Sequence, residues 1–156
     1  MMKQTFAIFF LSAFFCFVLL IAGCSGGRAK PKDLPPLYPC TLTFTQEGVP
    51  LADASIILHS DSKWSVGGKT DEKGEVRLAT NGFYEGVPEG TYKITVWKMV
   101  VEHHAETSEV IRQTDVVERK FSSEATTPLE ITIGKGNNNQ TFDVGKAVSV
   151  NIPISD

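Results

Sequence analysis

The sequence lacks an excess of positive charge and has few cysteine and histidine residues. Its 156 residues include 15 Lys and Arg against 18 Asp and Glu, so the formal net charge is −3. Because nucleic-acid-binding domains usually carry a basic patch, this balance argues against a nucleic-acid partner. The three cysteines and three histidines show neither the C-x-x-C nor the H-x-x-x-H spacing of zinc sites. The sequence therefore predicts no nucleic-acid partner and no cofactor.

Long apolar runs are also scarce, and the one that occurs lies near residue 1. Lys3 is the single charge before Thr5, and no charged residue occurs from there to Ala22. A basic start followed by an apolar run is the layout of a secretory signal peptide. The run is close to the ~20 residues that a membrane-spanning helix needs, so its length alone does not exclude an uncleaved anchor. No second run of this length follows.

The residues that end the run distinguish these two interpretations. Ile21-Ala22-Gly23-Cys24 resembles the lipobox of bacterial lipoproteins, in which small residues precede a cysteine. The resemblance implies that residues 1–23 are a signal peptide, with Ile21, Ala22 and Gly23 as the signal-peptidase motif. It also implies that Cys24 is acylated and attaches the chain to a lipid bilayer, where more than one acyl chain makes the anchoring stable.

Residues 24–39 are expected to be the lipid anchor and a linker. Gly, Pro and Lys without apolar periodicity dominate from Ser25 to Pro39, which is typical of a flexible, partly extended chain. Ser25 stands where an aspartate would retain a lipoprotein in the inner membrane under the sorting rule of enteric bacteria. We therefore expect a lipid anchor in the cell membrane or the outer membrane, with the outer membrane favoured. The domain then lies in the periplasm or at the cell surface.

A single cysteine, Cys40, is left for the domain if Cys16 leaves with the signal peptide and Cys24 is acylated. No intramolecular disulfide is then possible, so the fold must be held by its core. Cys40 alternates with Leu42 and Phe44, which favours a buried thiol that behaves as a small hydrophobic residue. Pairing with another chain is the alternative in an oxidising compartment.

Short segments of alternating apolar and polar residues make up most of the chain from residue 40 onward. A period of two is the pattern of strands with one buried face, and Gly and Pro turns separate the segments. The sequence therefore predicts an all-β domain, an antiparallel β-sandwich. Residues 100–125 are expected to form a long connection with at most a turn or two of helix. The expected strands are 40–46, 54–60, 75–80, 91–99, the pair 129–133 and 140–144, and an edge strand at 148–152.

Four segments resemble the motifs of carboxypeptidase-regulatory-like domains, in the order of that family. Three of them, Gly48–Ile56, Gly68–Val76 and Val87–Val96, resemble the patterns G-x-P-L-x-x-A-x-V, G-x-T-D-x-x-G and P-x-G-x-Y-x-V-x-V. Thr127–Ile133 resembles the closing S-P-L-x-x-x-V strand of the lipoprotein branch. The resemblance implies a seven-stranded transthyretin-like, immunoglobulin-like sandwich over residues 40–156. Such a fold does not by itself define a function.

We find no catalytic or metal-binding pattern on this scaffold. His103 and His104 invite a metal interpretation, but adjacent strand residues point to opposite faces. Transthyretin-like hydroxyisourate hydrolases end in Tyr-Arg-Gly-Ser, which the closing residues Asn151–Asp156 do not contain. The expected strand 40–46 lacks the Lys that forms the isopeptide bond of collagen-adhesin B-type domains. A non-enzymatic domain is therefore favoured, and a metal-dependent enzyme using His103 or His104 is the least favoured alternative.

Aromatic residues in expected loops supply the main alternative function. Trp64, Phe83 and Tyr84 lie in the loops 61–66 and 82–89 and would form a ligand-contact surface if they were exposed together. The competing interpretation is that they cap the open ends of the sandwich. The leading hypothesis is a membrane-anchored cell-envelope lipoprotein that displays a non-catalytic domain for interaction or structural purposes. Its partners would be the bilayer and an unknown envelope protein or glycan, and a glycan- or peptide-binding module using these aromatics is the alternative.

Overall fold

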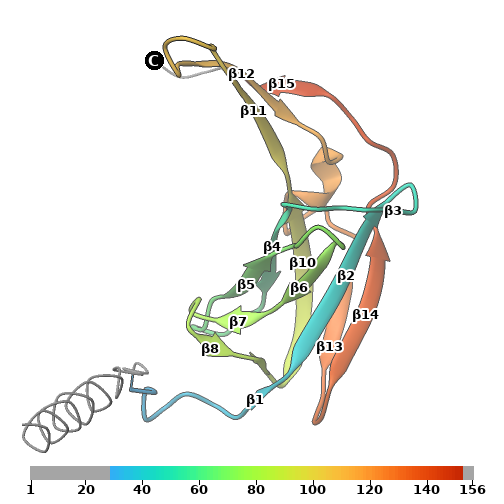
Figure 1. The fold of residues 1–156 in the computed structure, drawn as a ribbon. Helices are drawn as coiled ribbons and strands as arrows, with labels where there is room; N and C mark the ends of the chain where they lie inside the picture. Colours follow the sequence, from blue (N-terminus) through green and yellow to red (C-terminus); the bar gives the residue numbers. More distant parts are fainter. Residues whose placement is uncertain (1–28, 153–156) are drawn as a thin grey trace, which may run out of the picture.

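The computed structural model describes residues 29–152 (Figure 1). The expected signal peptide at 1–23 and the expected acylation at Cys24 lie outside the described residues. The described chain contains 15 strands, one short 3-10 helix (η2, Arg119–Phe121) and no α-helix, so the all-β class is confirmed. Several of the strands are only two or three residues long, and the expected number of seven strands is not confirmed.

The part of the chain that the structure describes holds no helix with the length and apolar character needed to cross a membrane.

Two larger sheets dominate the fold, and both contribute to its core. One has the strand order β13 (Glu130–Ile133), β10 (Gly90–Trp97), β4 (Ser55–His59), β5 (Val66–Lys69), β7 (Ala79–Thr80) and β8 (Tyr84–Glu85). The other contains β14 (Asn138–Asp143), β2 (Cys40–Gln46), β3 (Val49–Pro50) and β6 (Glu75–Arg77), in which β3 and β6 both pair with β2.

All these pairs are antiparallel except β14 with β2, which is parallel. The strands β13 and β14 do not pair with each other as expected. Instead the chain changes sheet between them, and each strand joins a different sheet.

Two smaller sheets correct the sequence-based expectations. The strand β1 (Leu37–Tyr38) pairs with β9 (Val87–Pro88), so the end of the expected linker belongs to the folded domain. The strands β11 (Met99–His103), β12 (Val110–Asp115) and β15 (Val150–Ile152) form a three-stranded sheet. The β11–β12 hairpin projects from the larger sheets at the end opposite β1 (Figure 1). The prediction of a long connection over residues 100–125 was therefore wrong.

The core confirms the inward faces that alternation predicts. Phe44 of β2 is 0% exposed and stacks on Phe142 of β14, with the ring centroids 5.6 Å apart. Burial of such side chains is the main favourable term in folding. The buried cluster consists of Cys40, Leu42, Phe44, Leu51, Ala54, Ile56, Leu58, Val66, Val76, Leu78, Val87, Tyr92, Ile94, Val96, Val117, Phe121, Ile131, Ile133, Phe142 and Val144.

The turn before β6 is built by the T-D-x-x-G segment. Thr70 is 4% exposed; its hydroxyl donates to the Leu51 carbonyl at 2.6 Å and accepts from the Ala54 N–H at 2.8 Å. Asp71 Oδ1 accepts from two backbone N–H groups of the turn, each at 2.9 Å. Gly74 has φ +74°, and a Cβ there would collide with a carbonyl oxygen of β2. This segment therefore fastens the turn to the strand beneath it.

Asp143, at the end of β14, performs a similar task for the β2–β3 turn. Its carboxylate accepts from the Gly48 N–H at 3.0 Å, the Thr45 hydroxyl at 2.7 Å and the Gly145 N–H at 2.7 Å. These hydrogen bonds, the one from Gly48 first, hold the pKa of Asp143 below its ordinary value.

Candidate functional site

A groove of about 680 Å³ lies where the chain leading into β2 passes two loops of the six-stranded sheet. Its walls come from residues 33–38, 60–64 and 88–92, which are far apart in sequence. The β1–β9 pairing holds the first segment against the third, and an ion pair between Lys63 and Asp33 joins the first to the second. We call this site the linker groove.

Aromatic rings form part of the linker groove. Trp64 and Tyr38 are both half-buried and present ring surface to it. Tyr92 lies beneath, 2% exposed, and its hydroxyl donates to the Pro88 carbonyl at 2.9 Å. Burial raises the pKa of Tyr92, as expected for a phenol removed from water. Trp64 and Tyr38 are therefore the rings available to a ligand, whereas Tyr92 supports the Pro88 turn.

The charged residues that line the groove are all acidic: Asp33, Asp61 and Glu89. The Lys63 ammonium pairs with Asp33 and holds the pKa of that carboxyl below its ordinary value. Asp61 and Glu89 are exposed, and neither carboxylate has a hydrogen-bond or ion-pair partner within residues 29–152. The groove thus combines aromatic surface with two unpaired negative charges.

The structure separates the three aromatic residues expected to form one ligand-contact surface. Trp64 lines the linker groove, but Phe83 and Tyr84 do not. Phe83 is 63% exposed in the loop before β8. Tyr84 is 9% exposed, and its hydroxyl donates to the Ala29 carbonyl at 3.1 Å. The expectation that Tyr84 offers its ring to a ligand is corrected, because this ring is buried and binds the protein's own linker.

Three of the residues that define the groove were missed by the sequence analysis: Tyr38, Asp61 and Glu89. The sequence shows that Asp61 follows the strand that ends at His59 and that Glu89 precedes the strand that begins at Gly90, but it does not show that these two strands pair. The register pairs His59 with Lys93 in antiparallel strands β4 and β10. The end of one strand therefore lies beside the start of the other, and their loops are neighbours.

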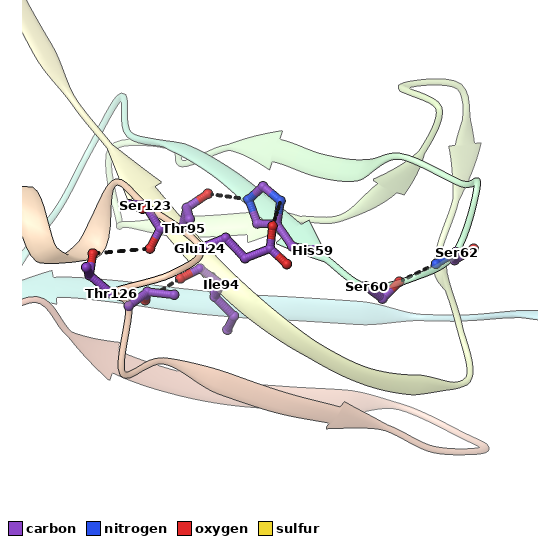
Figure 2. A network of polar contacts seen from close by, with 9 residues as sticks. His59, Ser60, Ser62, Ile94, Thr95, Ser123, Glu124 and Thr126 are labelled. Carbon is purple, nitrogen blue, oxygen red and sulfur yellow. Dashed lines mark hydrogen bonds and ion pairs between the residues drawn. The ribbon is translucent and has the colours of Figure 1, made fainter.

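A second polar cluster lies on the outer face of the six-stranded sheet (Figure 2). His59 Nε2 is 2.8 Å from Thr95 Oγ1, and His59 Nδ1 is 3.6 Å from a carboxylate oxygen of Glu124. The order hydroxyl, imidazole, carboxylate is that of a catalytic triad. These residues are separated by 36 and 29 positions (95 − 59; 124 − 95), so the sequence alone does not show that they lie together.

The geometry favours a structural role for this cluster. Thr95 is 7% exposed, so its hydroxyl lies low in the sheet, whereas an attacking hydroxyl must be reached by substrate. The separation of His59 and Glu124 exceeds hydrogen-bond length, so the carboxylate does not orient the ring as a triad acid does. In the same loop, the Thr127 hydroxyl donates to the Ile94 carbonyl at 2.6 Å. These contacts together fasten residues 122–128 to the sheet.

The histidines considered for a metal site lie at the tip of the β11–β12 hairpin. Both His103 and His104 are exposed. His103 Nδ1 is 3.1 Å from the Ser108 carbonyl, and His104 Nδ1 accepts from the Glu106 N–H at 3.4 Å. No group of three His, Cys, Asp or Glu side chains suited to a metal ion occurs within residues 29–152. A metal enzyme based on this pair would need a third ligand that the described chain does not supply.

Cys40 belongs to the core. Its side chain is 4% exposed, and burial raises the pKa of its thiol to about 11. The expectation of a buried cysteine is confirmed.

Comparison with known proteins yields little. No family model and no curated protein matches the sequence. Among solved structures, a crystal structure of a 9R-lipoxygenase from Cyanothece PCC8801 matches with 14% identity and a TM-score of 0.36. The match covers 75% of this chain and 18% of the lipoxygenase chain. At this TM-score the likeness supports no argument about fold or function.

Proposed function

We propose that this chain is a cell-envelope lipoprotein, tethered through an acylated Cys24, whose transthyretin-like β-sandwich binds a partner without catalysis. The observation that carries the binding part is the linker groove. Ligand sites are typically concave and lined by aromatic surface with a few polar groups, and they measure ~300–1,000 Å³. The groove, at about 680 Å³ with Trp64 and Tyr38 in its walls, has these properties.

The tether and the groove support each other. The lipobox-like sequence places the anchor at Cys24, and Asp33 in the groove wall follows nine residues later (33 − 24 = 9). Because an extended chain spans at most ~3.6 Å per residue, the anchor would hold the groove within about 30 Å of the bilayer. The partner we propose is therefore an envelope component close to the membrane, either a protein segment or a glycan that stacks on Trp64.

Acylation is tested by metabolic labelling with an alkynyl palmitate analogue. The wild-type chain and a Cys16→Ser control should incorporate the label and fractionate with membranes. Cys24→Ser should lose both properties, since the acceptor thiol is absent. Label retained in Cys24→Ser would contradict the lipoprotein assignment.

Binding at the groove is tested by placing a photo-crosslinking residue at Pro36, which is exposed in the groove wall. The matched control position is Glu72, which is exposed in the turn before β6. Irradiated cells should yield a discrete adduct from position 36 that Trp64→Ala abolishes, and none from position 72. Equal adducts from both positions would contradict groove binding. Substrate turnover by the purified chain that a single substitution abolishes would contradict the non-catalytic assignment.

A further inference from the structure

The chemistry of the linker groove selects among ligand classes. No Lys or Arg lines it, while Asp61 and Glu89 contribute carboxylates without a partner in the described chain. An anionic ligand would be repelled by these carboxylates, whereas a cationic ligand would be attracted to them. The groove is therefore complementary in charge to a cation.

One cation already shows how the aromatic part of this site interacts with positive charge. The Lys63 ammonium lies 5.0 Å from the centroid of the Trp64 ring and also pairs with Asp33. A distance within ~6 Å of the ring centroid is that of a cation–π contact. The Lys63 and Asp33 side chains are 65% and 59% exposed, so the pair contributes little to stability. An incoming cation can therefore exchange with Lys63 at small cost.

The size of the groove calls for more than a single ion. Its volume of about 680 Å³ accommodates a basic side chain together with the main chain on either side of it. Among basic groups, a guanidinium stacks on aromatic rings and is more weakly hydrated than an ammonium, so it is the better fit to Trp64 beside carboxylates.

We infer that the linker groove binds an extended peptide segment through a basic side chain, arginine in preference to lysine, with the cation on Trp64 and its charge balanced by Asp61 and Glu89. This inference rests on the proposed binding function and names its ligand class.

The test uses the full chain in nanodiscs of zwitterionic lipid, so that basic peptides do not bind the bilayer, with empty nanodiscs as the blank. Calorimetric titration compares an acetylated, amidated peptide Ala-Gly-Arg-Gly-Ala with the same peptide carrying citrulline, the uncharged isostere of arginine. The arginine peptide should bind at least tenfold more tightly, and its affinity should fall as NaCl is raised. Equal affinity of the two peptides, or no binding of either, would overturn the inference.

Some variants should weaken peptide binding and another should strengthen it, and this contrast makes the test specific. Trp64→Ala and the double variant Asp61→Asn/Glu89→Gln should each weaken arginine-peptide binding about tenfold. Lys63→Ala should strengthen it about threefold or more, because it removes the internal competitor and frees Asp33. Glu72→Gln, on an exposed turn away from the groove, should leave it unchanged. An unchanged affinity in Lys63→Ala would show that the cation does not share the Trp64–Asp33 position and would overturn the inference.

A neutral oligosaccharide, cellohexaose, serves as the competing ligand. One outcome would refute the basic-peptide inference and leave the proposed binding function intact. In that outcome cellohexaose binds, Trp64→Ala abolishes its binding, and neither the arginine peptide nor the citrulline peptide binds. The crosslinking experiment at position 36 reports on that function independently.

Discussion

Replacing Thr70 with valine substitutes a methyl group for the hydroxyl and leaves the side-chain volume nearly unchanged. That hydroxyl is the hydrogen-bond partner of both the Ala54 N–H and the Leu51 carbonyl, and it is buried with them. A buried polar group left without a hydrogen bond costs ~1–3 kcal/mol. Two such groups remain after Thr70→Val, so we expect the free energy of unfolding to fall by about 3 kcal/mol, a large share of the ~5–15 kcal/mol typical of a domain.

The measurement is urea unfolding of the full chain in mild detergent, followed by the fluorescence of Trp64 and Trp97. With a denaturant slope of ~1.5 kcal/mol per molar, the expected loss lowers the midpoint by about 2 M. Thr70→Ser is the matched control, because it keeps the hydroxyl and deletes only a methyl group, at about 1 kcal/mol. Stability should therefore decrease in the order wild type, Thr70→Ser, Thr70→Val. A valine variant as stable as the serine variant would refute the claim that the hydroxyl holds this turn.

Three further predictions concern the backbone at Gly74, the buried thiol of Cys40 and the Asp143 carboxylate. Gly74→Ala should lower the melting temperature much more than Gly82→Ala, since both glycines have positive φ but only a Cβ at position 74 collides with main chain; equal shifts in differential scanning calorimetry would contradict this. The thiol of Cys40 has a pKa of about 11 against an ordinary 9.0, so its reactive thiolate is about 100-fold scarcer at pH 8 than that of a free thiol. Cys40 should therefore react about 100-fold more slowly with Ellman's reagent, and Cys40→Ser should not change the number of rapidly reacting thiols in the folded chain. Because the pKa of Asp143 is lower in the folded chain than its ordinary value of 3.8, the ionised carboxylate stabilises the fold at pH values above 3.8. This stabilisation is lost as the pH falls through the folded-state pKa. Asp143→Asn should therefore lose less stability than the wild type below about pH 4, in acid titrations followed by circular dichroism.

Alternation of residue type was sufficient to identify the strands that cover the core. In β2 the buried residues are Cys40, Leu42 and Phe44, in the order that a period of two requires. The same agreement holds in β10 for Tyr92, Ile94 and Val96. These strands have one face against the core and one face outward, which is the condition under which alternation carries information.

The strands β11 and β12, which lack a buried apolar face, escaped prediction for the same reason. Thr114 is the only buried residue of β11 and β12, so neither strand shows an inward set. The strand β5 escaped for another reason, because it contains Gly67 and Gly68, which are typical of turns. A Cβ at Gly67 would lie 2.7 Å from the Ile56 carbonyl oxygen, and one at Gly68 would lie 2.6 Å from a Val76 methyl. Close packing of neighbouring strands requires glycine there, and composition alone does not show this.

The sequence by itself determined what depends on neighbours along the chain: the all-β class, the buried sides of the main strands, and the Thr70–Gly74 turn. It also carries the lipobox-like residues around Cys24, whose role stays a prediction. Only the tertiary structure decided the parallel pairing of β14 with β2, the burial of Tyr84, and the linker groove. The physical reason is that each of these depends on contacts between segments tens of residues apart. The aromatic and acidic loop residues form a possible binding site only because strand pairing brings residues 33–38, 60–64 and 88–92 around one groove.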